Sequence, residues 1–106
     1  MRFRSLFPKI EIMNSEKLFE RKLREVVARL GGIALKLLSP SFTGLPDRLV
    51  LMPGGRLWFV ELKSTGKKQS PRQKVVSDLL RRLGFIVWVI DNEITLSEFL
   101  YEIQRA

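Results

Sequence analysis

Two carboxylates and one amine in the middle of the chain have the types and the spacing needed for metal-assisted hydrolysis of a phosphodiester. Asp47 follows Pro46, while Glu61 and Lys63 end an apolar run. Residues two apart in a strand lie about 6.6 Å from each other and point to the same face. Counting back from the turn at 53–55 places Asp47 about opposite Glu61 to Lys63. We therefore expect the three side chains to meet at the ends of two adjoining strands.

The chemistry expected of this trio depends on a hard divalent cation. Such a cation takes carboxylate, carbonyl and water oxygens, so Asp47 and Glu61 would bind it and the backbone carbonyl of Leu62 would add a neutral ligand. Lys63 would orient the attacking water or stabilise charge on the phosphate, which suits a compact point charge. Glu20 would complete the shell through a water molecule or bind a second metal.

Each member of the trio also has an ordinary structural explanation. Asp47 alone would be a cap at a turn or at a strand end, and Glu61 with Lys63 alone would be a surface ion pair. Clusters of this kind mark functional sites more often than they stabilise folds. The three residues together therefore favour a site.

The composition excludes several other kinds of chemistry. The chain has 106 residues, enough for one domain, and contains no cysteine and no histidine. Thiolate zinc sites, histidine bases and Ser-His-Asp triads are therefore excluded, and Mg²⁺ or Mn²⁺ is the expected metal. The net charge of +8 predicts a polyanionic partner, with DNA first and an anionic membrane surface second.

We interpret residues 1–13 as an N-terminal extension of unknown role and residues 14–106 as a single domain. No apolar run approaches the roughly 20 residues that a membrane span requires. The first residues also lack the pattern of a secretion signal. We therefore expect a cytoplasmic protein.

The elements that must position the trio follow from apolar periodicity, caps and turns. We predict a helix from 14 or 15 to 30, strands at 33–38, 47–52 and 56–63, a helix at 71–83, a strand at 85–90 and a helix from 95 to 104. Asn14 or Ser15 would cap the first helix, Ser70 the second, and a capping box of Thr95 and Glu98 the last.

This order predicts an α/β fold with a central mixed sheet flanked by helices. Along the strand at 56–63, Glu61 and Lys63 would share one face, and Trp58, Val60 and Leu62 the other. Both faces are largely apolar, which indicates a strand covered on both sides. The strand at 85–90 is apolar throughout, and we expect it to be an inner parallel strand reached through a crossover helix.

Residues 15–91 resemble the VRR-NUC (virus-type replication-repair nuclease) modules of the PD-(D/E)xK nuclease superfamily. The features that match, in order, are a Glu-bearing first helix ending in Gly-Gly, a Ser-Pro loop, Gly-x-Pro-Asp, a Pro-Gly-Gly hairpin, Phe-Val-Glu-Leu-Lys and the Ser-Pro-x-Gln opening of the next helix. The resemblance implies a restriction-endonuclease-like αβββαβ core.

The resemblance also implies roles for individual residues. Asp47 and Glu61 would be metal ligands, Lys63 would be catalytic, and Gln73 would lie beside the site. Glu20 corresponds to the family's first-helix glutamate by its offset from the Gly-Gly pair, and Glu16 is its rival by one helical turn.

The leading hypothesis is a Mg²⁺- or Mn²⁺-dependent, structure-selective DNA endonuclease. Small stand-alone members of the resembled family form homodimers and cut branched DNA such as four-way (Holliday) junctions, and larger members act on flaps. The first alternative is a non-catalytic DNA-binding module, against which the retained trio argues. The second is a flap nuclease or a sequence-specific nuclease, and the short chain leaves little room for a separate element that reads sequence.

Basic residues cluster directly after the trio, in a loop and at the start of the next helix: Lys67, Lys68, Arg72 and Lys74. A basic face is often merely solvated. Beside a phosphodiesterase site, contacts with DNA phosphates are the better interpretation. Such contacts position DNA without reading its sequence, and they weaken with salt.

Overall fold

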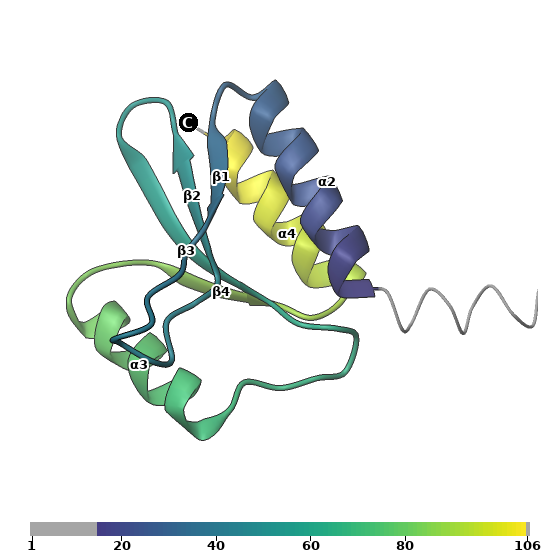
Figure 1. The fold of residues 1–106 in the computed structure, drawn as a ribbon. Coiled ribbons are helices and arrows are strands. Elements are labelled where there is room, and N and C mark those ends of the chain that lie inside the picture. Colours follow the sequence, from purple (N-terminus) through teal and green to yellow (C-terminus); the bar gives the residue numbers. More distant parts are fainter. Residues whose placement is uncertain (1–14, 106) are drawn as a thin grey trace, which may run out of the picture.

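The residues that the computed structural model describes, 15–105, form an α/β fold (Figure 1). In chain order the elements are helix α2 (Ser15–Arg29), strands β1 (Ile33–Lys36), β2 (Arg48–Met52) and β3 (Arg56–Leu62), helix α3 (Pro71–Arg82), strand β4 (Val87–Ile90) and helix α4 (Glu93–Gln104). The predicted extension at residues 1–13 and the predicted cap at Asn14 lie outside the described residues. None of the described helices is long and apolar enough to cross a membrane.

The described strands form one mixed sheet in the order β1-β2-β3-β4. The first three strands pair antiparallel, and β4 pairs parallel to β3. The predicted mixed sheet and parallel last strand are confirmed, but β4 lies at the edge of the sheet, so its prediction as an inner strand was wrong. It also begins at Val87 rather than at Phe85, because Gly84 and Phe85 still bond to carbonyls in the last turn of α3.

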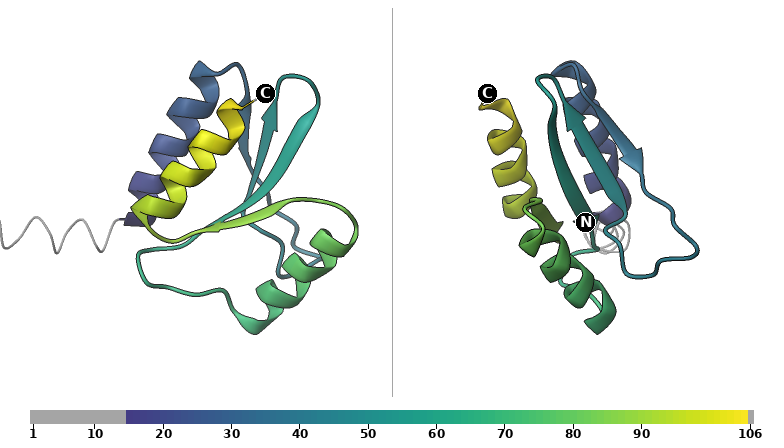
Figure 2. Two further views of the ribbon diagram at one scale, coloured as in Figure 1. Left: turned by 180° about the vertical axis from the view of Figure 1, so that it is seen from behind. Right: turned by 90° about the vertical axis from the view of Figure 1, so that its left-hand side faces the viewer.

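Helices α2 and α4 lie side by side over one face of the sheet (Figures 1 and 2). Their apolar side chains pack against alternate residues of β3. The buried core cluster includes Phe19, Leu23 and Val27 of α2, Trp58, Val60 and Leu62 of β3, and Leu96, Phe99 and Ile103 of α4. Because side chains alternate along a strand, Glu61 points to the opposite face. Helix α3 lies apart from α2 and α4, toward that face.

The last helix begins two residues earlier than predicted, and its cap lies three residues earlier. Asn92 is its N-cap, and the Asn92 Oδ1 atom accepts hydrogen bonds from the Thr95 amide at 2.8 Å and from the Thr95 hydroxyl at 3.0 Å. Thr95 therefore donates to the cap instead of being the cap. Asparagine is as good an N-cap as serine or threonine, and the apolar run of β4 ends just before it, so the helix begins at the first suitable residue.

This cap gives a test of the fold. Replacing Asn92 by alanine should lower the free energy of unfolding by about 1 kcal/mol, because the Thr95 amide and hydroxyl lose their acceptor. That change corresponds to a fall of about 4–8 °C in melting temperature for a domain of this size. Glu98→Ala, the matched change at the predicted capping box, should have little effect. Equal losses in thermal unfolding of the two variants would contradict the observed cap.

Candidate functional site

The two predicted acids lie side by side where β2 begins and β3 ends. The sheet pairs Arg48 with Val60, so Asp47 and Glu61 occupy the next opposing positions. The Asp47 amide donates to Glu61 Oε1 at 3.2 Å, and the Leu62 amide donates to Asp47 Oδ1 at 3.2 Å. At this point the two strands are joined by hydrogen bonds from backbone amides to carboxylate side chains instead of by backbone–backbone bonds. For this reason β2 begins at Arg48 rather than at Asp47 as predicted, and β3 ends at Leu62 rather than at Lys63.

The predicted amine and the predicted glutamine both contact Glu61. Lys63 Nζ lies 3.3 Å from Glu61 Oε2, and Gln73 Nε2 donates to the same oxygen at 3.0 Å. Gln73 is held by the capping box of α3, in which its Oε1 atom accepts from the Ser70 amide at 2.9 Å. The structure therefore brings four predicted residues into one group and places Gln73 beside the acids.

Burial makes both carboxyl groups of the pair harder to ionise. It raises the pKa of Asp47, and the nearby charge of Glu16 adds to the effect, while the Leu62 amide, Arg48 and Lys63 oppose it. Burial also raises the pKa of Glu61, and repulsion from Asp47 raises it further. Lys63 opposes this shift. Two adjacent acids whose negative charges are incompletely balanced are a suitable environment for a divalent cation.

The donor set at this point fits a hard cation. The Leu62 amide faces Asp47, and in an antiparallel pair the amide and carbonyl of one residue point to the same neighbour, so the Leu62 carbonyl also faces the Asp47 side. Among the described residues, no group of three or more Asp, Glu, His or Cys side chains could hold a metal ion. A cation bound by Asp47 and Glu61 would therefore complete its shell with a carbonyl and waters, as Mg²⁺ commonly does.

Glu20, the predicted third acid, is not brought into this group. Its Oε2 atom lies 3.1 Å from Arg24 and 3.5 Å from Arg48, and these two ion pairs account for its charge. Glu16, one turn earlier on α2, is close enough to raise the pKa of Asp47. Glu16 is thus the first-helix acid whose charge acts on Asp47, whereas Glu20 is paired with two arginines.

Arg48 is a residue that the sequence interpretation missed. It is buried, and its Nη1 atom donates to the Asp47 carbonyl at 3.1 Å while its Nη2 atom pairs with Glu20. A buried guanidinium requires partners of this kind. The bond from Arg48 therefore holds the backbone carbonyl of Asp47 in place. It also lines a depression of about 270 Å³ together with Lys36 and acidic and basic residues of α2. A charged residue at a position that was predicted to lie within a strand, directly before the apolar run at 49–52, was the available signal.

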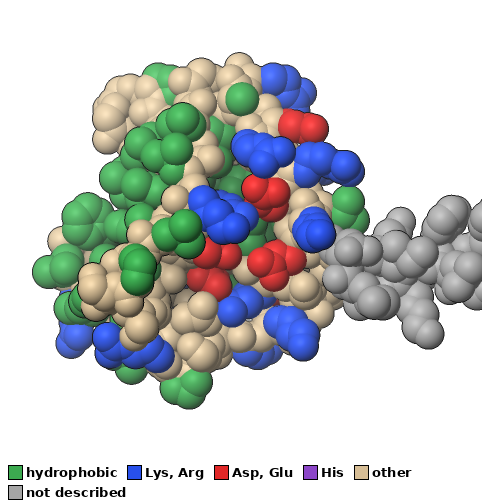
Figure 3. Space-filling view, in the orientation of Figure 1, with side chains coloured by type: hydrophobic (Ala, Val, Ile, Leu, Met, Phe, Trp, Pro, Cys, Tyr) green, Lys and Arg blue, Asp and Glu red, His purple; other side chains and the backbone are tan. Residues whose placement is uncertain are grey.

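The predicted basic cluster divides into two parts. Lys67, Lys68 and Lys74 line one hollow of about 300 Å³, together with Gln69, Val89 and Asp91. Arg72 lies elsewhere, because its Nε atom donates to the Thr43 carbonyl at 3.3 Å. In the space-filling view, acidic side chains gather near the middle of one face, and Lys and Arg side chains surround them (Figure 3).

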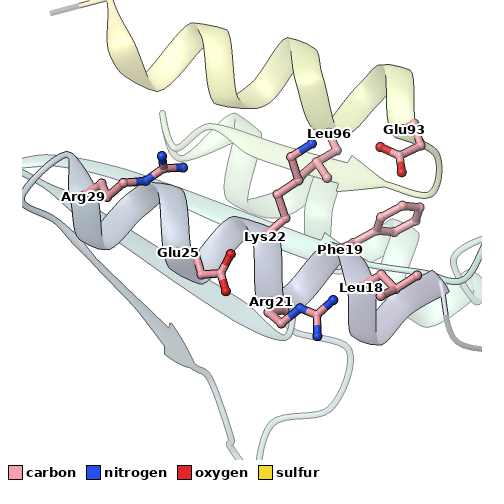
Figure 4. Close-up of a pocket in the computed structure, with 8 residues that line it drawn as sticks. All are labelled: Leu18, Phe19, Arg21, Lys22, Glu25, Arg29, Glu93 and Leu96. Carbon is pink, nitrogen blue, oxygen red and sulfur yellow. The ribbon is translucent and has the colours of Figure 1, made fainter.

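A separate pocket of about 310 Å³ lies between α2 and α4 (Figure 4). Its lining mixes the apolar Phe19 and Leu96 with charged residues of both helices, including Lys22 and Glu93. Phe19 and Leu96 belong to the core on the α2 and α4 face of the sheet. This pocket is therefore distinct from the acidic pair, which lies on the opposite face.

Comparisons with known proteins agree with this geometry. No protein-family model matches the chain. The protein named "Putative nuclease p44" of Acyrthosiphon pisum secondary endosymbiont phage 1 is 42% identical over 78 residues, which cover 74% of this chain and 84% of that protein. A solved structure described as "VRR_NUC domain" superposes with a TM-score of 0.76 at 30% identity, covering 81% of this chain and 94% of that chain. Sequence and fold therefore lead to the same group of proteins.

Proposed function

Because the chain belongs to the VRR-NUC family and is a nuclease, we propose that it is a Mg²⁺- or Mn²⁺-dependent endonuclease that hydrolyses phosphodiester bonds in branched DNA. The observation that carries this proposal is the crosswise bonding of Asp47 and Glu61, with the amine of Lys63 on the second carboxylate. A binding module without catalysis has no need to bury two repelling acids beside an amine.

The residues of the group have separate tasks in this proposal. Asp47 and Glu61 hold the cation, with the Leu62 carbonyl as a neutral ligand. When bound, the cation supplies Lewis-acid assistance to the phosphate and makes a water molecule more acidic. Gln73 keeps the Glu61 carboxylate oriented, and Arg48 does the same for the backbone of Asp47.

Lys63 acts on the phosphate rather than on the cation. Its side chain is 21% exposed, whereas that of Glu61 is only 3% exposed, so the amine lies between the buried acid and the solvent from which DNA arrives. A cation held by Glu61 would compete with the amine for this oxygen and would release it toward the substrate. A compact ammonium group can then stabilise charge that develops on the phosphate.

The assay that tests the proposal compares four-way junctions, flaps and plain duplex in Mg²⁺, in Mn²⁺ and in EDTA. Cleavage of branched DNA only in the presence of metal is the expected result. Binding without any cleavage would support a non-catalytic module instead. Cutting of plain duplex at one sequence would support a sequence-specific nuclease.

Gln73 offers a test in which a matched variant controls for the loss of folding stability. Gln73→Ala and Ser70→Ala both break the capping box of α3, but only Gln73→Ala also removes the hydrogen bond to Glu61. Partners that orient metal ligands are typically worth about 10- to 100-fold in activity or metal affinity. We therefore expect Gln73→Ala to cleave about 10- to 100-fold more slowly than Ser70→Ala at similar melting temperatures. Equal cleavage rates of the two variants would show that Gln73 has no role in the site.

The three-lysine hollow is proposed to bind DNA phosphates. Each phosphate contact contributes roughly 0.9 to the slope of log affinity against log salt for duplex DNA. Replacing Lys67 and Lys68 together by alanine should therefore reduce this slope by about 2, measured by titration of labelled DNA at several salt concentrations. Lys22→Ala, a change in the separate pocket between α2 and α4, is the control and should leave the slope unchanged. The same slope for both variants and the wild type would exclude the hollow as a phosphate site.

We further propose that the protein acts as a homodimer, so that two sites at a fixed separation select branched DNA by its shape. Support comes from large apolar side chains left exposed on α3 and on the segment that follows it: Val75, Leu79, Leu83, Phe85 and Ile86. Five exposed large apolar side chains within twelve residues are the kind of surface that a second copy of the chain could cover. Light scattering of the wild type and of Leu83→Glu compares the masses directly, and only the wild type should be dimeric.

A further inference from the structure

The connection between β1 and β2, which leads directly into Asp47, carries two exposed apolar side chains. Leu38 is 76% exposed and Phe42 is 43% exposed. The connection ends at Asp47, and the Leu37 amide donates to the Asp47 carbonyl at 2.9 Å, which closes the base of this loop. In the right-hand view of Figure 2 the loop stands out from the rest of the ribbon. Both side chains are therefore available at the surface beside the site.

The loop is fixed to the first turn of α3. Arg72 donates to the Thr43 carbonyl, and Gly44 approaches α3 so closely that an added Cβ atom would lie 2.8 Å from Arg72 Cγ and 2.9 Å from Val76 Cγ2. Gly44 also has a φ of 91°, which other residues rarely adopt. Because the same helical turn carries Gln73, the loop and the acidic pair share one support. The part of the loop that carries Phe42 is thus held in place before any ligand binds.

Phe42 has the surroundings of a stacking platform. The Arg72 guanidinium carbon lies over its ring at 5.6 Å from the centroid, yet the ring remains partly exposed. Aromatic rings and arginine planes are the groups on which proteins stack unpaired bases. An apolar protein partner would have to desolvate the Arg72 charge, whereas nucleic acid is attracted by it. The chemistry around the ring therefore favours a nucleobase.

We propose that Phe42, supported by Arg72, stacks on an unpaired base at the branch point of the DNA substrate, beside the phosphate that is cut. This inference rests on the proposed function and adds a reason for selectivity. Bases inside a continuous duplex are paired and stacked on one another and cannot reach the ring, whereas an unpaired base at a branch point can.

The test measures binding in EDTA, so that it does not depend on cleavage. The probes are a four-way junction with one unpaired 2-aminopurine at the branch point and a duplex of equal length with the same base paired. Phe42→Ala should weaken binding of the junction about tenfold, as expected for one lost stacking contact, and should leave duplex binding unchanged. Phe42→Trp should retain the preference. The junction's fluorescence should be quenched by the wild type and by Phe42→Trp, but not by Phe42→Ala.

Tyr101 provides a matched control. It is 66% exposed, and the Arg105 guanidinium carbon lies over its ring at 5.9 Å, but it lies on α4 on the other side of the sheet. Tyr101→Ala should therefore change neither binding nor fluorescence. An unchanged preference of Phe42→Ala for the junction would overturn the inference, as would an equal loss of binding affinity for both probes. A change in the mass of Phe42→Ala by light scattering would also overturn it. Failure of the proposed function would appear separately, as absence of metal-dependent cleavage by the wild type.

Discussion

Replacing Asp47 by asparagine should abolish DNA cleavage and make the metal-free protein more stable. Asparagine keeps the oxygen that accepts from the Leu62 amide but removes the charge that would hold the cation. Loss of several kcal/mol of metal assistance corresponds to a fall of roughly 1,000-fold or more in cleavage rate. Binding of DNA in EDTA should be retained.

The gain in stability follows from the direction of the pKa shift. Burial raises the pKa of Asp47 above its ordinary value, so between the two values the unfolded chain releases its proton more readily than the folded one. Stability should then fall as pH rises above about 4. Asp47→Asn removes this loss, so its melting temperature at neutral pH should exceed that of the wild type, and the difference should shrink toward pH 4.

Asp78→Asn is the control for this experiment. Asp78 is an exposed residue of α3 that pairs with Arg81 at 3.2 Å, and exposed pairs of this kind contribute at most about 1 kcal/mol. Its replacement should change neither cleavage nor the pH dependence of melting. Mn²⁺ should raise the melting temperature of the wild type and of Asp78→Asn, but not that of Asp47→Asn. Asp47→Asn with normal cleavage would contradict the role of this carboxylate.

Lys63→Met should abolish cleavage without loss of cation binding. Removing a charge-stabilising donor typically costs about 100- to 1,000-fold in rate. The amine contacts Glu61 Oε2 in the metal-free protein, so its removal takes away a competitor of the cation. Mn²⁺ affinity by calorimetry should therefore be unchanged or higher. Lys63→Arg should not restore cleavage, because a planar guanidinium does not replace a compact ammonium.

The contrast between the two variants separates the two roles. Asp47→Asn should lose cation binding and cleavage together, whereas Lys63→Met should lose only cleavage. If Lys63→Met lost Mn²⁺ binding to the same degree as Asp47→Asn, Lys63 would be a structural part of the cation site. If it cleaved at a normal rate, the amine would be only a partner of Glu61.

The position of the acidic pair could be predicted because a tight hairpin fixes the register of β2 and β3. Once the turn at 53–55 is recognised, Asp47 and Glu61 must face each other. The role of Gln73 came only from the family resemblance, because without it Gln73 would pass for an ordinary residue of the helix that Ser70 caps. The acidic pair could thus be placed from an interaction between segments that are close in sequence.

The features that were missed depend on contacts between distant segments. The sequence does not show that Arg48 would pair with Glu20 of α2, nor that Arg72 would bond to the loop before β2 instead of facing solvent. The rotation of α2 about its axis decides whether Glu16 or Glu20 approaches Asp47, and the Gly-Gly ending fixes its length but not this angle. The place of β4 at the sheet edge likewise depends on the absence of a further strand among the described residues.

A crystal soaked in Mn²⁺ tests the central claim most directly, because anomalous scattering locates the ion without assumptions about its ligands. We expect a peak between the side chains of Asp47 and Glu61, at roughly 2.0–2.3 Å from oxygens of both, with the Leu62 carbonyl and waters completing the shell. The claim would be contradicted if the anomalous peak lay elsewhere in the molecule and no ion lay between Asp47 and Glu61, with each carboxylate still bonded to the backbone of the other strand.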